Sequence, residues 1–227
     1  MLVRDFIHYL ENGELATAYD KFSDPDDLDM LMSNIRIALT TLYTRFPLIE
    51  KQVTIQRFPH ISNYVLDRRY AVSNRESTEL YRYILDTLED PFTNDVISIR
   101  SGYTGDGREV MLNDYSRPTN SFFVSGNTIQ IPDTLYCGEL AIFIYQANHP
   151  VITDEDSPLL VPEYLLEALL AYVSSRMFGT RSDEAAMKQS ANYLGKYDAE
   201  CEKVKEFNLI PNCNTVTNIK PIRGGWI

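Results

Sequence analysis

Apolar residues recur at three- and four-residue spacing near the start of the chain, which predicts two helices there. The first is short and amphipathic, covers residues 2–10 and ends near residues 12–13. The second begins at Asp24, a residue type that caps helix N-termini, and ends at Phe46 before a proline. Its apolar stripe consists of Leu28, Leu31, Ile35, Leu39, Leu42 and Phe46.

The middle of the chain changes to the two-residue alternation that is typical of β-strands. Strands are predicted over residues 51–57, 63–67, 95–104, 109–113, 121–125, 128–131 and 138–148. Glycine-containing turns at 105–107 and 126–127 predict hairpins, so the strands should be mainly antiparallel. One helix is expected among them, over residues 78–90, with Leu80, Ile84 and Leu88 on one side.

The last part of the chain is again helical. A helix is predicted from Pro162 to Phe178, closed by a glycine, and another from Asp183 to about Asn208. The apolar stripe of the second comprises Met187, Ala191, Leu194, Cys201 and Val204. After Pro211 the periodicity is lost, and the chain should be extended.

These elements predict an α+β fold in which an antiparallel helical bundle carries an inserted antiparallel β-rich module and an extended C-terminal arm. The bundle would be discontinuous and combine residues 1–50 with 160–209. The β-rich insertion with its one short helix would cover residues 51–159, and the arm residues 210–227.

Composition restricts the classes of partner. The chain has 227 residues and a formal net charge of −11, so it has no general electrostatic attraction to nucleic acid phosphates. Its three cysteines are far apart, which makes a disulfide framework or a zinc site improbable. The first ten residues include charges and do not resemble a signal peptide, and no apolar run approaches the roughly 20 residues of a membrane span.

Candidate chemistry is sparse, and no catalytic, cofactor-binding or metal-binding residues are predicted. His149 follows a strand and precedes a proline, so it is interpreted as a strand-end residue. Glu163 and Glu167 lie one helical turn apart, and residues 154–156 are all acidic. An enzyme, for instance a cell-wall hydrolase carried on a virion, would have to use these carboxylates. A solvated or intersubunit helix edge and a solvated loop explain them better.

The helix starting at Pro162 is apolar on nearly every side, and such a helix is buried all round. It is either a central core helix or a helix that turns one face to a neighbouring copy of the chain. The residues proposed for such an intersubunit contact are Tyr164, Leu165, Leu169, Tyr172 and Val173.

The C-terminal arm carries apolar residues in a stretch without local periodicity. These are Val216, Ile219, Pro221, Ile222, Trp226 and Ile227. Exposed apolar ends are a liability unless they dock on a surface. The arm therefore either packs on its own chain or binds a partner, and its prolines and paired glycines favour a partner.

Several segments in sequence order resemble the head-to-tail adaptor (connector) proteins of short-tailed bacteriophages. They are IALTTLYTRFPL at 37–48, YVLD at 64–67, YAVSN at 70–74, DPF at 90–92, VMLND at 110–114, NTIQIP at 127–132, YQANHP at 145–150, LLEALLAYV at 165–173 and NYLGKY at 192–197. The resemblance covers most of the chain to about Leu209 and does not include the arm.

The resemblance implies a structural virion protein made in the host cytoplasm and placed at the head-tail interface. Such proteins form a homo-oligomeric ring, a dodecamer, beneath the portal protein and bind it, often with a terminal arm. The ring extends the DNA channel, through which DNA passes without sequence-specific binding, and it offers a platform for tail or nozzle proteins. No membrane is involved. The alternative within the virion is a tail-completion or tail-tube component.

Overall fold

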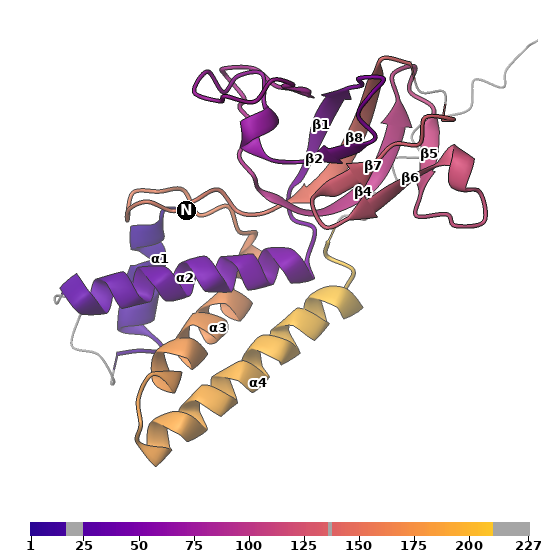
Figure 1. Cartoon of the computed structure of the whole chain (residues 1–227). Coiled ribbons are helices and arrows are strands. Elements are labelled where there is room, and N and C mark those ends of the chain that lie inside the picture. The colour runs from indigo at the N-terminus through magenta and orange to yellow at the C-terminus, as the bar shows by residue number, and fades with distance from the viewer. Residues whose placement is uncertain (17–24, 136–137, 211–227) are drawn as a thin grey trace, which may run out of the picture. The chain divides into compact units, whose positions relative to one another are not determined.

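The computed structural model describes residues 1–16, 25–135 and 138–210 (Figure 1). These ranges contain four α-helices and one eight-stranded sheet, so the protein is a mixed α/β protein. The chain divides into two compact units. Met1–Ala38 together with Asp154–Ile227 form the first, here called the helical unit, and Leu39–Thr153 form the second, the sheet unit. The boundary between the two units falls within one helix, α2.

The predicted helices near both chain ends are confirmed, with small shifts at their ends. They are α1 (Val3–Asn12), α2 (Pro25–Arg45), α3 (Leu166–Gly179) and α4 (Glu184–Glu206), with a short 3-10 turn, η3 (Glu163–Leu165), before α3. The predicted stripe of α2 is also confirmed, because Leu31, Ile35, Leu39, Leu42 and Phe46 are buried. Asp24, the predicted cap, lies outside the described residues.

Helices α3 and α4 form a hairpin in the helical unit (Figure 1). Asp183 caps the start of α4 by accepting a hydrogen bond from the backbone N–H of Ala186 at 3.1 Å. Ser175 and Ser190 tie the helices together, because each hydroxyl donates to the other residue's carbonyl, at 2.9 and 2.8 Å. Aromatic pairs between the two helices add packing along the hairpin. They are Phe178 stacked on Tyr193 and Tyr172 against Tyr197.

The acidic loop at residues 154–156 belongs to the helical unit and covers the N-terminus of α1. The backbone N–H of Val3 donates to the carbonyl of Ser157, and that of Arg4 to the carbonyl of Glu155. These are two of the N–H groups that a helix start leaves without an intrahelical partner. The loop therefore has a structural role in satisfying the first turn of α1.

The sheet unit contains all eight strands, in the order β2-β7-β6-β5-β4-β8-β1-β3. Their bounds are β1 (Glu50–Gln56), β2 (Asn63–Val65), β3 (Ile84–Leu85), β4 (Val96–Thr104), β5 (Glu109–Leu112), β6 (Ser121–Ser125), β7 (Thr128–Gln130) and β8 (Leu140–Ala147). All pairs are antiparallel except β5 with β6, so the predicted strands and their mainly antiparallel pairing are confirmed.

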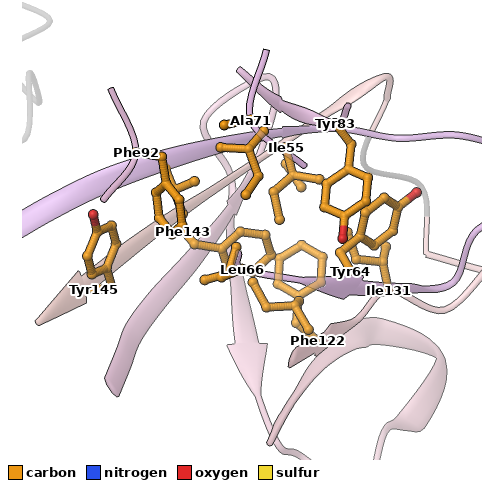
Figure 2. Packing of buried hydrophobic residues seen from close by; sticks show 14 of the residues in the cluster. Ile55, Tyr64, Leu66, Ala71, Tyr83, Phe92, Phe122, Ile131, Phe143 and Tyr145 are labelled. Carbon is orange, nitrogen blue, oxygen red and sulfur yellow. The ribbon is translucent and has the colours of Figure 1, made fainter. Parts of the chain in front are cut away.

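The sheet curls around a single hydrophobic core, drawn in Figure 2. Side chains from both ends of the strand order meet there, including Tyr64 of β2, Ile55 of β1 and Phe122 of β6. The Tyr83 hydroxyl, just before β3, accepts from the N–H of Val65 and donates to its carbonyl, at 2.8 and 2.9 Å. The two edge strands are therefore linked through one side chain, and the sheet approaches closure.

A buried glutamine connects the end of α2 to the sheet. The Gln146 amide nitrogen donates to the carbonyls of Tyr43 and Phe46, and its oxygen accepts from Ser98 and Arg100. The last carbonyls of a helix have no intrahelical donor, and this side chain supplies a donor to them. The Phe46 carbonyl also accepts from the backbone N–H of Leu48, at 2.9 Å.

Two sequence predictions are wrong at this level. The fold class is not a helical bundle with an inserted β-rich module, because the eight-stranded curled sheet has a complete core of its own and is the principal element. The helix predicted over residues 78–90 is absent. Ile84 pairs with Ile55 as part of β3, while Leu80 and Leu88 are 83% and 65% exposed, so their helical spacing was coincidental.

Candidate assembly surfaces

The helix α3, proposed for contact between copies, is largely covered within its own chain. Leu165, Leu169 and Val173 are completely buried, and only Tyr164 and Tyr172 of the predicted set retain partial exposure. The buried three fit a central core helix, which was the alternative interpretation. An intersubunit role for the two tyrosines stays a prediction.

The second helix of the hairpin, α4, buries Cys201 and Val204 of its predicted stripe but not the other three residues of that stripe. Its buried side chains follow a helical stripe that consists of Ala186, Tyr193, Tyr197, Cys201 and Val204, with Tyr193 half-buried. Met187 and Leu194 from the predicted stripe are 57% and 45% exposed, and Ala191 is exposed too. At about 100° per residue, these three lie about a quarter turn from the buried face.

We call Met187, Ala191 and Leu194 the outer stripe of α4. The four- and three-residue steps between them place them on one line along the helix. Gly195, beside Leu194, has nothing within 4 Å of the position a Cβ would take. The outer stripe is therefore an apolar, unobstructed line on a helix whose other apolar face is already packed, which is a geometry suited to helix–helix contact.

A second surface feature is a pocket in the sheet unit, where β1 and β3 diverge. The two strands pair only at Thr54 with Leu85 and at Ile55 with Ile84. Beyond these pairs a pocket of about 400 Å³ opens between residues 51–54 and residues 84–92, with Phe92 and Tyr145 in its lining. We call this pocket the strand fork.

The strand fork is acidic. Burial raises the pKa of Asp86, but hydrogen bonds from the Ser73 side chain and from the backbone of Phe92 and Ser73 outweigh burial, so its pKa is below the ordinary value. Asp86 is therefore ionised at neutral pH, and Asp90 lies beside it in the lining. The carboxylates thus give the opening a negative charge.

The one lysine of the lining already has an acidic partner. Lys51 Nζ lies 2.6 Å from Asp95 Oδ2, and the Tyr145 hydroxyl donates to Asp95 Oδ1 at 3.0 Å. Burial and the Asp95 carboxylate together raise the pKa of Tyr145, so the phenol stays protonated. Because Lys51 and Asp95 neutralise each other, Asp86 and Asp90 determine the net charge of the fork.

Two of the carboxylates considered for an enzyme, Glu167 and Asp156, form ion pairs within the helical unit. Glu167 forms an ion pair with Lys196 at 3.0 Å, and the same ammonium reaches Glu14 at 3.2 Å. Asp156 pairs with Arg4 at 2.8 Å. Glu163 is exposed in the turn η3. The contacts of Lys196 link α4 to α3 and to Glu14, just after α1, and the Asp156 contact links the acidic loop to α1.

His149 is buried at the end of β8, as expected for a strand-end residue. Its ring packs edge-on against Tyr43, with centroids 5.4 Å apart, and Nδ1 lies 2.6 Å from the carbonyl oxygen of Pro150. A carbonyl can only accept, so Nδ1 carries the proton. Burial lowers the pKa of His149, although the hydrogen bond to Pro150 opposes this, and the imidazole is neutral at pH 7.

The C-terminal arm residues, Val216 to Ile227, lie outside the described residues, as do Cys137 and Cys213. In the described ranges, no three His, Cys, Asp or Glu side chains are grouped as a metal site would require. None of the helices described is both long and apolar enough to cross a membrane.

Compared with known proteins, the chain matches no family model and no curated protein.

Sequence reasoning missed both surfaces for identifiable reasons. Met187 and Leu194 were assigned to the core because the predicted stripe left out Tyr193 and Tyr197. The rings of these two tyrosines lie on the buried face of α4. The sequence of α4 carries two apolar stripes, the buried one and the outer stripe, and this doubling was the signal that could have revealed an exposed apolar line. The strand fork had no local signal, because it depends on where a two-residue strand stops pairing.

Proposed function

We propose that the chain is a structural head-to-tail adaptor of a tailed phage, which forms a ring beneath the portal at the head-tail interface of the virion. The ring, a dodecamer by the resemblance, extends the DNA channel and carries tail or nozzle proteins. The observation that supports assembly best is the outer stripe of α4, an exposed apolar line on a helix that is already packed on another face. A helix with no further partner would place polar residues there.

The resemblance supplies the particular assembly. Two of the resembling segments, at 165–173 and 192–197, fall on α3 and α4, so they include Leu194 of the outer stripe. In the proposal, α3 forms the core of the helical unit while α4 meets a neighbouring copy. The arm, with Trp226 and Ile227 near its tip, makes the contact with the portal.

Mixing the purified chain with portal protein tests this function. Mass photometry should detect a complex whose mass corresponds to a portal ring with a full set of adaptor copies. Lack of association at micromolar concentrations of both proteins would contradict the proposal. Monomers in the absence of portal agree with it, because the portal ring can serve as the template for assembly.

The arm has its own test within the same assay. Deleting Asn212 to Ile227 should leave a folded protein, with an unchanged far-UV circular dichroism spectrum, that binds portal at least about tenfold more weakly. A matched variant that replaces only Trp226 by alanine separates the tip from the rest of the arm. Unchanged binding of both variants would contradict the role of the arm.

The two alternative functions are tested by the position of the protein in the particle and by its activity. A tail-completion or tail-tube protein would appear below the adaptor layer in a cryo-electron microscopy map of the intact particle. A cell-wall hydrolase would release peptidoglycan fragments and would lose that activity on changing Glu163 and Glu167 to alanine.

A further inference from the structure

The edge of β1 that faces β3 is paired over only part of its length. Neighbouring residues of a strand direct their backbone N–H and C=O groups to opposite sides. The N–H of Arg57 donates to the carbonyl of Glu139, just before β8, at 2.7 Å. The N–H of Gln56 donates to the carbonyl of Tyr83, just before β3, at 2.8 Å. Even-numbered residues of β1 therefore face β3, and the exposed Gln52 among them has no strand of the described residues beside it on this side.

The segment after β3 does not extend the pairing to Gln52. The register of β3 on β1 would place Thr87 opposite Gln52. Thr87 instead forms a turn, in which its N–H donates to the carbonyl of Asp90 at 3.4 Å and its hydroxyl accepts from the N–H of Asp90 at 3.0 Å. The backbone groups of Gln52 therefore point into the strand fork. An open strand edge of this kind is a template for an added strand.

The strand fork has room for the side chains of an added strand. Its volume of about 400 Å³ lies within the range of ligand sites. Val53, Phe92 and Tyr145 supply apolar lining, and the two aromatic rings meet edge-on with centroids 6.3 Å apart (Figure 2). A lining of this kind accommodates β-branched side chains and the methylene stems of lysine or arginine.

The charge of the fork selects among possible occupants. Asp86 is ionised, and the carboxylate of Asp90 is exposed and has no ion-pair partner within the described ranges. A second copy that paired its own β1 edge here would bring the same carboxylates together, and like charges across an interface oppose binding. An extended segment that carries lysine or arginine meets both requirements, because it fits the edge and compensates the charge.

We propose that the strand fork is a docking site for an extended, basic segment of another protein, which adds a strand to β1 at Gln52 and places a lysine or arginine beside Asp90. The proposal goes beyond the adaptor function, because it assigns a binding site and the chemistry of its partner to the sheet unit. It does not depend on that function, since the site lies within one copy of the sheet unit.

A synthetic peptide tests the docking on the full-length chain. The probe is a labelled, end-capped peptide of seven residues in which lysine and valine alternate, and fluorescence anisotropy at about 50 mM salt measures its binding. The same peptide with glutamate in place of lysine should bind at least about tenfold more weakly. A lysine peptide that is N-methylated at every residue keeps its charges but has no N–H donors, and it should lose at least about tenfold too.

Two variants of the chain locate the site. Gln52→Pro removes the N–H that faces the fork and should weaken binding of the lysine peptide at least about tenfold. Asp90→Lys should weaken it to a similar extent and should strengthen binding of the glutamate peptide. The matched control is Glu109→Lys, at an exposed position of β5 outside the fork, which changes the net charge equally and should bind the lysine peptide like the native chain.

The outcomes separate strand addition from its alternatives. Equal binding of the N-methylated peptide would show attraction by charge alone and would overturn the proposal, as would equal weakening by Asp90→Lys and Glu109→Lys. A dimer in sedimentation equilibrium that Gln52→Pro dissociates would indicate pairing between two β1 edges and would overturn it too. Far-UV circular dichroism checks each fold, and if Gln52→Pro is unfolded, the N-methylated peptide decides on the native chain. The assay contains no portal, so the docking and the adaptor function can each fail without the other.

Discussion

Substitutions of single buried polar side chains test how the sheet unit is stabilised. Gln146 is 1% exposed, and its amide serves the end of α2 and strand β4 at the same time. Gln146→Leu should reduce the free energy of unfolding by about 2–4 kcal/mol, because it removes the hydrogen bonds that this buried side chain makes with Ser98, Tyr43 and Phe46. Urea unfolding followed by circular dichroism measures this loss. Gln130→Leu, the same change on an exposed strand position, should stay within about 0.5 kcal/mol.

His149 should make stability depend on pH in a defined window. Burial lowers the pKa of His149 in the folded protein below the 6.5 of the unfolded chain. Between the folded pKa and 6.5, the unfolded chain therefore binds a proton that the folded chain does not. Stability is therefore complete above pH 6.5 and falls as the pH drops through this window. The urea midpoint measured from pH 7.5 to pH 5 should show this fall in the native chain and a smaller one in His149→Gln.

At the scale of the element, α4 carries the prediction that bears most directly on assembly. Met187→Lys combined with Leu194→Lys should leave stability within about 0.5 kcal/mol, because both side chains are already exposed. The same double variant should weaken association between copies on the portal at least about tenfold, because two charges would be buried unpaired. Mass photometry of the portal mixture measures the number of copies bound.

The matched control adds the same charge elsewhere on α4. Gln189→Lys combined with Asn192→Lys changes two exposed polar positions off the outer stripe. This pair should assemble like the native chain. If both double variants assemble equally well, the outer stripe has no role between copies.

The elements of this fold were predictable from the sequence where the pattern was local. The stripe from Leu31 to Phe46 and the turn at Gly107, whose φ is +83°, depend on residues close in the chain, and both are as predicted. The predicted helix at 78–90 failed because a long-range pairing of Ile84 with Ile55 overrode a local spacing. Strand order is likewise non-local, since β8 lies between β4 and β1. The size of the sheet, and with it the fold class, could not be obtained from periodicity.

The distribution of charge over the whole molecule gives the last prediction. The sequence has one adjacent pair of basic residues, Arg68-Arg69. The positive charge of this pair is reduced in the fold, because Arg69 lies 3.2 Å from the Asp67 carboxylate. With a net charge of −11 and no counterion release to drive binding, the chain should not bind a duplex of about 30 base pairs even at about 50 mM salt. Fluorescence anisotropy of a labelled duplex, with protein up to micromolar concentration, measures this. Binding that weakens steeply with salt would contradict the prediction and would reveal a basic surface. Absence of binding is what the proposed DNA channel requires, because DNA would pass along its wall without being held.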